Sequence, residues 1–253
     1  MIYSGITDTG RVRKNNEDAF HIEEFELKCT GTSAVLAVVC DGMGGAVAGE
    51  KASSIAVSTF SNNVVRQVKA YSDELSNLDN IPFEKILRDG VKMANKAVLT
   101  ESTQNPECAG MGTTLAAVLC VSGKIFAINI GDSRIYKLDS DTFTRVSTDH
   151  SYVQSLIENG TITEAQAKVH PERNVILKAI GASVNAEPDT FVLSPETQKI
   201  LICSDGLTNM LQEFEIATIL TEEPDTEKEA KQLVECANNA GGVDNITVVV
   251  ISL

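Results

Sequence analysis

The sequence predicts an α+β fold in which antiparallel sheets carry helices on their outer faces. Apolar residues at helical spacing occur in neighbouring pairs of segments, one pair in each half of the chain. Between these pairs, short apolar runs follow one another and are separated by tight-turn residues, as in antiparallel strands. Strands that alternate one by one with helices would instead indicate a doubly wound parallel sheet. Because no stretch resembles a linker, we expect one domain over residues 1–253.

The N-terminal part is expected to begin with two edge strands within residues 1–22, on either side of a polar loop over residues 11–18. A buried strand over residues 34–40 follows, and the glycines after it lead into a helix. The sequence predicts a second helix after Pro82, and it predicts a surface loop over the polar stretch 71–80 between the two helices.

The middle of the chain is expected to form one meander of antiparallel strands. These strands cover residues 114–121, 124–130, 134–138 and 142–146. Residues 149–174 contain two short helical patterns and few core signals, so we expect them to form a mobile surface flap. The remaining expected elements are strands near 190–193 and 199–203, a helix around Ile216, a helix with Thr226 as its cap, and a last strand over 246–251.

Composition excludes several functional classes. A formal charge of −14 argues against nucleic acid as a partner, because phosphates would be repelled. The six cysteines contain no Cys-x-x-Cys pair, which favours a reducing cytosol. The first residues lack the apolar core of a signal peptide, and no apolar run approaches the roughly 18 residues of a membrane helix. We therefore expect a cytoplasmic monomer without membrane insertion.

Four aspartates stand at the tips of short apolar runs, where buried strands leave the core. They are Asp41, Asp132, Asp205 and Asp244. Each lies in an Asp-Gly, Gly-Asp or Asp-Asn sequence that, taken alone, is an ordinary turn. Several such turns beside buried strands favour convergence on one rim instead, and convergent carboxylates with few basic neighbours call for a cation. Asn16-Glu17-Asp18 adds two more carboxylates, which in isolation indicate a solvated loop.

The chemistry of the expected metal follows from its ligands. None of the three histidines is spaced with another histidine or cysteine as in a zinc site, whereas oxygen ligands suit Mg²⁺ or Mn²⁺. Two such ions activate a water and clamp a phosphoryl group, so phosphoester hydrolysis is the predicted reaction. Arg13, just before the acidic loop residues, offers a fork that fits phosphate oxygens, although a basic patch of this kind also forms plain surface ion pairs.

Together these residues resemble one family, the metal-dependent serine/threonine phosphatases of the PP2C (PPM) type, in their compact bacterial form. The resemblance spans essentially the whole chain and rests on six short motifs in the order typical of the family. They are Val12-Arg13-Lys14-Asn15-Asn16-Glu17-Asp18, Asp41-Gly42-Met43-Gly44-Gly45, Gly112-Thr113-Thr114, Gly131-Asp132-Ser133-Arg134, Ser204-Asp205-Gly206-Leu207 and Asp244-Asn245-Ile246-Thr247.

The resemblance implies a four-layer αββα sandwich with a dinuclear Mn²⁺ or Mg²⁺ centre at one end of the sheets. It implies that Asp41 bridges the ions, that the Gly42 carbonyl supports one of them, and that Asp205 and Asp244 hold the other. Glu17 and Asp18 are implied to contact the centre directly or through water, and Asp132, with Asp205, matches a third metal position. Arg13 becomes the phosphate clamp, and Asn245 supports the ligands from behind.

The implied function is hydrolysis of phosphoserine and phosphothreonine in proteins, a signalling role opposed to that of a serine/threonine kinase. One departure is visible, because Met43 stands where animal members carry a histidine proposed as general acid. Two alternatives are a catalytically dead scaffold that binds phosphoproteins and a stress-regulator phosphatase with a single antagonist as substrate. The complete carboxylate set disfavours the first, and Arg13 and the flap disfavour the second.

Overall fold

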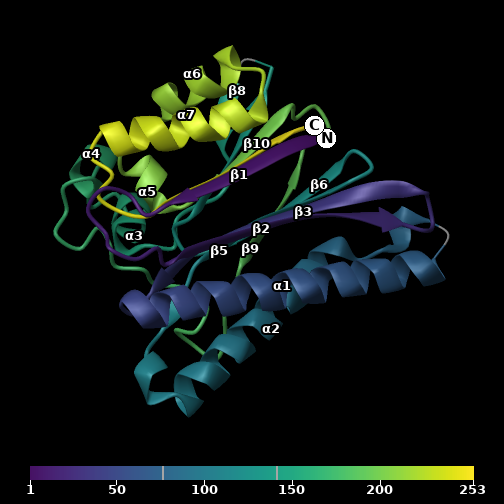
Figure 1. Ribbon diagram of the computed structural model, residues 1–253, viewed down its shortest axis with the longest axis horizontal. Coiled ribbons are helices and arrows are strands. Elements are labelled where there is room, and N and C mark those ends of the chain that lie inside the picture. Colours follow the sequence, from purple (N-terminus) through teal and green to yellow (C-terminus); the bar gives the residue numbers. More distant parts are fainter. Residues whose placement is uncertain (76, 141) are drawn as a thin grey trace.

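The computed structural model of the protein describes residues 1–75, 77–140 and 142–253, and it contains two antiparallel sheets with helices on the outer face of each (Figure 1). The five-stranded sheet has the order β1 (Ile2–Asp8), β11 (Ile246–Ser252), β10 (Lys199–Cys203), β7 (Arg134–Asp139) and β8 (Thr142–Arg145). The six-stranded sheet has the order β2 (Asp18–Leu27), β3 (Thr32–Met43), β5 (Leu115–Val121), β6 (Lys124–Ile130) and β9 (Asp189–Leu193), with the short β4 (Gly112–Thr113) paired to β3.

The helices divide between the two outer faces. The long helices α1 (Ala46–Glu74) and α2 (Phe83–Gln104) pack on the six-stranded sheet, and α5 (Asp205–Thr208), α6 (Glu213–Glu222) and α7 (Thr226–Asn239) pack on the five-stranded sheet. Two short 3₁₀ turns, η1 (Leu78–Asn80) and η2 (Pro106–Cys108), stand beside α2. The predicted α+β fold with a four-layer αββα arrangement is confirmed.

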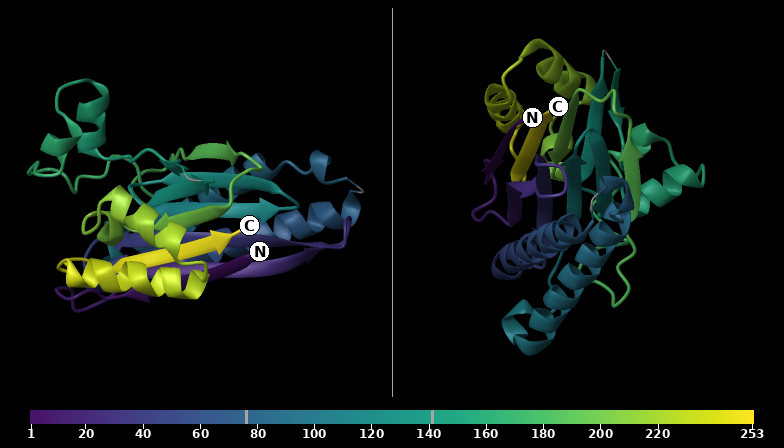
Figure 2. Two further views of the ribbon diagram at one scale, coloured as in Figure 1. Left: turned by 90° about the horizontal axis from the view of Figure 1, so that it is seen from above. Right: turned by 90° about the vertical axis from the view of Figure 1, so that its right-hand side faces the viewer.

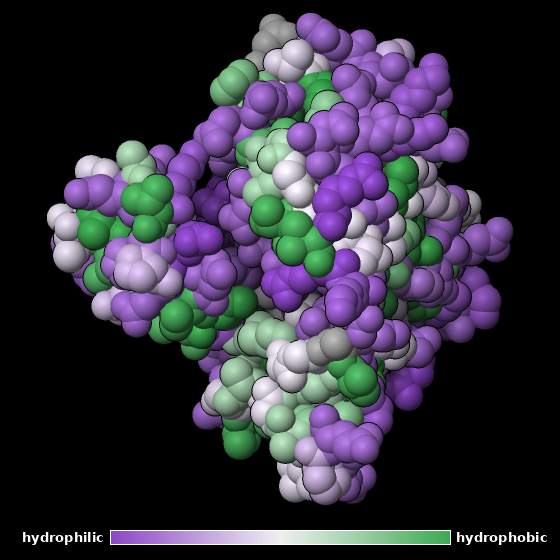
Figure 3. Space-filling view, turned by 60° about the vertical axis from the view of Figure 1, so that its left-hand side comes forward, coloured by the Kyte–Doolittle hydropathy of each residue, from purple (hydrophilic) through white to green (hydrophobic). Residues whose placement is uncertain are grey.

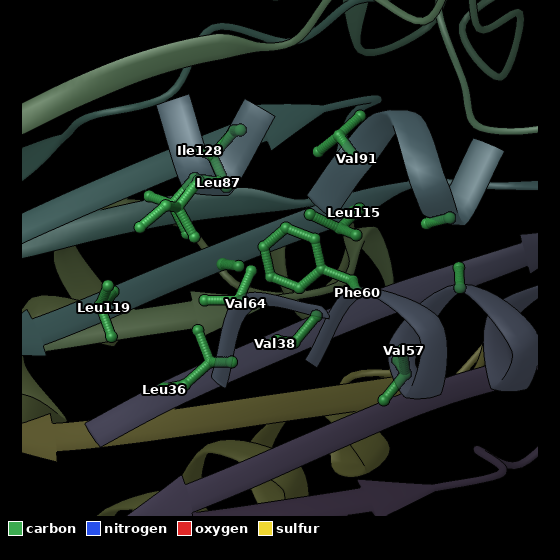
Figure 4. Close-up of a cluster of buried hydrophobic side chains, with 14 of the residues drawn as sticks. Leu36, Val38, Val57, Phe60, Val64, Leu87, Val91, Leu115, Leu119 and Ile128 are labelled. Carbon is green, nitrogen blue, oxygen red and sulfur yellow. The ribbon is translucent and has the colours of Figure 1, made fainter. Parts of the chain in front are cut away.

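Three separate hydrophobic clusters hold the four layers together. One lies under α1 and α2, where Phe60 and Val64 of α1 meet Leu87 of α2 above the strands (Figure 4). A second lies under α5 to α7, and a third fills the space between the sheets. Residues 34–40 of β3 have no exposed surface at any position, because one face of the strand meets helices and the other meets the second sheet. This explains why the run does not alternate between apolar and polar residues.

The chain ends and the flap complete the shape. The termini lie side by side because β1 and β11 pair from Ile2–Ser252 to Asp8–Ile246. Residues 149–174, which contain α3 (Tyr152–Glu158) and α4 (Glu164–Ala167), project from the body of the molecule (Figure 2). No helix in the described part of the chain is both long and apolar enough to cross a membrane.

Most predicted elements are present, but the meander was predicted wrongly. Strands β5 and β6 form a hairpin in the six-stranded sheet, while β7 and β8 belong to the five-stranded sheet. The turn at residues 131–133 therefore passes between the sheets instead of closing a hairpin. Gly131 makes the crossing with a φ of 109°, which glycine adopts without strain. The crossing carries Asp132 to the open end of the sandwich.

Other boundaries also differ from the prediction. β3 continues through Asp41 to Met43, and α1 continues to Glu74. Seven of the ten residues of the predicted loop 71–80 are therefore helical or 3₁₀, and residue 76 of that loop lies outside the described residues. The cap of α7 is Asp225, not Thr226, because the Asp225 carboxylate accepts the backbone N–H groups of residues 227 and 228. The one-turn helix α5 was not predicted.

Candidate metal centre

The predicted acidic residues meet at one end of the two sheets. Asp18 opens β2 and lies opposite Asp41 of β3 in the strand pairing. Asp205 is the first residue of α5, directly after β10, and Asp244 stands just before the neighbouring strand β11. Asp132 arrives from the turn between the sheets. Segments from five distant parts of the chain thus bring five aspartates to the same end of the sandwich.

Asp41 is fixed through its backbone by the Gly112-Thr113-Thr114 motif. The Asp41 N–H donates to Thr114 Oγ1 over 2.8 Å, and the Asp41 carbonyl accepts from Thr113 Oγ1 at 2.8 Å and from the Thr114 N–H at 2.9 Å. Thr114 Oγ1 also lies 2.7 Å from Ser133 Oγ, beside Asp132. The two threonines therefore hold the Asp41 strand and the Asp132 turn in one hydrogen-bonded unit.

Gly42 and Gly49 are required by close approach of the backbone and of Glu17. A Cβ at Gly42 would lie 2.1 Å from the Gly49 carbonyl oxygen and 2.6 Å from that of Glu17. A Cβ at Gly49, in the first turn of α1, would lie 1.8 Å from Glu17 Oε2. Any side chain at either position would displace the acidic loop, so these glycines set the place of Glu17 beside Asp41.

Asn245 holds the loop that carries Arg13 and Glu17. Its side-chain carbonyl accepts the Glu17 N–H at 2.8 Å, and its amide donates to the carbonyl oxygens of Thr9 and Asn15 at 3.0 and 2.9 Å. Asn245 therefore lies behind the acidic residues and supports them, as predicted.

Burial and mutual repulsion disfavour ionisation of the inner aspartates. Burial is the largest cause in each case, and the charges of neighbouring aspartates add to it. The pKa of Asp18 is raised to about 7 and that of Asp132 to about 8. The pKa of Asp41 is raised well above its usual value, and that of Asp205 is also raised. Divalent cations bound among these groups would remove the repulsion and return the carboxylates to their charged form.

One oxygen of Asp18 is left without a partner. Asp18 Oδ2 accepts from Ser204 Oγ at 2.7 Å and from Thr247 Oγ1 at 2.6 Å, whereas the buried Oδ1 has no hydrogen-bond partner. A buried polar atom without a partner is costly. A cation or a cation-bound water at Oδ1 would satisfy it, so the donor set fits a hard divalent ion.

Within the described residues, no three acidic, histidine or cysteine side chains already surround a single cation position. Two of the aspartates are turned towards other partners. Asp244 Oδ2 accepts from Arg13 Nη2 at 2.8 Å, and Asp205 Oδ2 accepts from Asn209 Nδ2 at 2.9 Å. A cation bound at Asp244 would therefore have to displace Arg13.

His150 lies in the flap, but its ring is not on the surface. Its ring is buried at the base of the flap, where Nδ1 accepts the Gly131 N–H at 3.1 Å and Nε2 lies 3.1 Å from Asp189 Oδ2. Burial lowers the pKa of His150, so the ring is neutral near pH 7. The sequence offered no sign of this, because the partners are 19 and 39 residues away.

Comparisons with known proteins agree with this geometry. A family model described as protein phosphatase 2C matches residues 10–244. The serine/threonine phosphatase stp of Listeria welshimeri is 36% identical over 97% of this chain and 93% of that protein, and the protein phosphatase PhpP of Streptococcus pneumoniae is 33% identical over 100% and 98%.

Solved structures agree as well. A crystal structure of a bacterial serine phosphatase has a TM-score of 0.86 at 32% identity and covers 100% of this chain and 97% of its own. The catalytic domain of the serine/threonine phosphatase PstP in complex with two manganese ions has a TM-score of 0.78 at 31% identity and covers 98% and 96%.

Proposed function

Because the chain belongs to the protein phosphatase 2C family and is a metal-dependent serine/threonine protein phosphatase, we propose that its divalent cations bind at the aspartate cluster at one end of the two sheets. Asp41 would be shared between two Mn²⁺ or Mg²⁺ ions, the Gly42 carbonyl would help to hold one of them, and Asp205 and Asp244 would hold the other. Glu17 and Asp18 contact the ions directly or through water. The whole chain acts as one phosphatase domain.

The observation that carries this proposal is the cluster of repelling carboxylates with an unsatisfied oxygen. Asp18, Asp41, Asp132 and Asp205 all have raised pKa values, and Asp18 Oδ1 has no hydrogen-bond partner. Such a cluster destabilises the fold unless it serves a ligand. The charge of Asp205 contributes to the raised pKa of Asp132, which supports a third cation near these two carboxylates.

The bound ions supply an activated water and a clamp for the phosphoryl group. Arg13 contributes the other positive charge. Its guanidinium lies at Asp244, is half exposed, and remains charged, because its hydrogen bond to Asp244 raises its already high pKa. Once Asp244 turns to a cation, the fork of Arg13 is free to bind two phosphate oxygens.

The leaving serine or threonine oxygen must gain a proton, and neither Met43 nor His150 is suited to donate it. Met43 has no ionisable group, and both ring nitrogens of His150 already have partners. We therefore propose that solvent in the cleft, not a histidine, delivers this proton. The catalytically dead alternative is disfavoured because the acidic residues are complete and gathered at one end.

Substrates are phosphorylated proteins, as the names of the relatives state for those enzymes. We further propose that a serine/threonine kinase opposes the enzyme, and that the phosphatase acts as a monomer in the cytoplasm. A broad substrate range is favoured over a single antagonist because Arg13 and the projecting flap are both present.

A phosphatase assay with and without chelator tests the proposal. The protein should hydrolyse aryl phosphates and phosphothreonine peptides with Mn²⁺, and chelation should abolish both activities. Asp41→Asn should be nearly inactive, while Asn77→Asp, on the exposed surface away from the centre, should behave as the parent. Turnover in excess chelator, or a requirement for Zn²⁺, would contradict the dinuclear site.

A further inference from the structure

Two exposed valines lie directly beside the phosphate-binding arginine. Val12 precedes Arg13 and is 65% exposed, and Val243 precedes Asp244 and is 47% exposed. Their two loops are joined on either side of them. The Arg11 N–H donates to the Gly242 carbonyl at 2.7 Å, and the Asn245 side-chain amide donates to the Asn15 carbonyl at 2.9 Å. The two loops are thus held together, and Val12 and Val243 lie at the same end of the sandwich as the aspartates.

Met210 extends this apolar surface. A Cβ placed on Gly241 would lie 3.5 Å from Met210 Sδ and 3.7 Å from Val243 Cγ1, so both side chains border the glycine. Gly241 and Gly242 have φ values of 138° and 52°, which favour glycine, and no side chain rises between Met210 and Val243. We refer to Val12, Met210 and Val243 as the apolar rim.

The apolar rim leads from Arg13 towards the flap. Gln212, two residues after Met210, accepts a hydrogen bond from Lys168 of the flap, and the neighbouring Val169 is 78% exposed. In Figure 3 the flap projects as a separate lobe, with a hollow between it and the body and hydrophobic surface beside the hollow. A chain bound at Arg13 through its phosphate and directed towards the flap would therefore pass the apolar rim.

Val12 and Val243 are exposed beside the acidic residues of a protein with a net charge of −14, and Met210 is partly buried next to Val243. Isolated exposed valines need no explanation, but two exposed valines next to a binding site, bordered by a partly buried methionine, favour contact with a ligand. An extended peptide advances about 3.3 Å per residue, so a residue next to the phosphorylated one reaches only a few ångströms from Arg13.

We propose that the apolar rim binds an apolar side chain of the substrate, one or two residues from the phosphoserine or phosphothreonine. The enzyme thus prefers phosphoprotein segments in which the phosphorylated residue has an apolar neighbour. This specificity rests on the proposed function, because the position of the peptide is set by the phosphate on Arg13. The occupant is the substrate chain itself, since the rim is continuous with that phosphate site.

The test compares phosphothreonine peptides that differ only by leucine or asparagine at one of the four positions nearest the phosphothreonine. At one or more positions the parent should prefer leucine by about three- to tenfold in kcat/KM, the effect of one partly buried apolar side chain. The double variant Val12→Ser with Val243→Ser should lose most of this preference. Ile2→Ser is the matched control, because Ile2 is 68% exposed and lies at the opposite end of the sandwich.

Each outcome decides the proposal. A parent without leucine preference at any of the four positions overturns it, as does a double variant that keeps the full preference. An equal loss of kcat/KM by the double variant on both peptides and on an aryl phosphate would make the apolar rim part of the catalytic framework, and it would also overturn the proposal. If the parent forms dimers and the double variant is monomeric, the apolar rim serves self-association instead, and the proposal is overturned. Activity that survives chelation would contradict the metal centre, whereas the comparison of leucine with asparagine peptides would still decide the apolar rim.

Discussion

Replacement of Arg13 by alanine separates phosphate binding from metal binding. The guanidinium makes one contact, 2.8 Å to Asp244, and the two side chains are 50% and 29% exposed. An exposed pair of this kind contributes about 0 to 1 kcal/mol to stability, so the melting temperature of the variant should change little. A charge-assisted bond to phosphate contributes about 1.5 to 3 kcal/mol, so kcat/KM should fall about ten- to a hundredfold.

Metal affinity should not fall in Arg13→Ala, because the substitution frees Asp244 from a competing partner. The assays are steady-state kinetics on an aryl phosphate and titration calorimetry with Mn²⁺. Lys14→Ala is the control, since Lys14 is exposed and its substitution removes the same charge from the same loop. An Arg13→Ala protein that loses Mn²⁺ affinity, or that keeps the activity of the Lys14→Ala protein, would refute the role of Arg13 as phosphate clamp.

Three further predictions concern the flap, His150 and the response to pH. Val169→Asp in the flap should change relative rates among phosphopeptides more than aryl phosphate turnover, and equal losses with a lower melting temperature would instead make the flap part of the core. His150→Gln should lower stability, because it disturbs both hydrogen bonds of the buried ring. The ratio of phosphopeptide to aryl phosphate rates should stay within about tenfold of the parent's ratio. A selective collapse of phosphopeptide turnover would instead identify His150 as the general acid. In the presence of chelator, the protein should melt at a lower temperature at about pH 8 than at about pH 5.5. At pH 5.5 folded Asp18, with its pKa raised to about 7, holds a proton that the unfolded chain has lost, and this stabilises the fold; at pH 8 the folded state loses the proton too, so the stabilisation disappears. Mn²⁺ should remove part of this difference, and an Asp18→Asn protein with the parent's full pH dependence would show that Asp18 is not its source.

The sequence predicted the layers because burial leaves a clear pattern. Residues 34–40 are apolar without a break and prove to be buried on both faces, and the helix after Pro82 begins at Phe83 as predicted. The short turn at residues 131–133 could not be assigned from local pattern, because a hairpin and a crossing between sheets use the same residue types. Only the packing of β7 against β10 in the other sheet distinguishes them.

The acidic residues of the site were predictable, but their supports were not. Asp41, Asp205 and Asp244 stand beside buried strands, which is visible in the sequence. Ser204 and Thr247, which bind Asp18 Oδ2, are ordinary polar residues until β10 and β11 bring them together. Burial of His150 likewise depends on contacts across the fold, and no local pattern encodes such contacts.

Anomalous diffraction from crystals soaked in Mn²⁺ tests the central claim most directly. The account predicts two strong peaks joined by the Asp41 carboxylate, about 3.5 to 4 Å apart, one next to the Gly42 carbonyl and the other between Asp205 and Asp244. Arg13 should then have left Asp244 and point into the cleft. The absence of manganese beside Asp41, or peaks only at carboxylates elsewhere on the surface, would contradict the assignment of these residues as the metal centre.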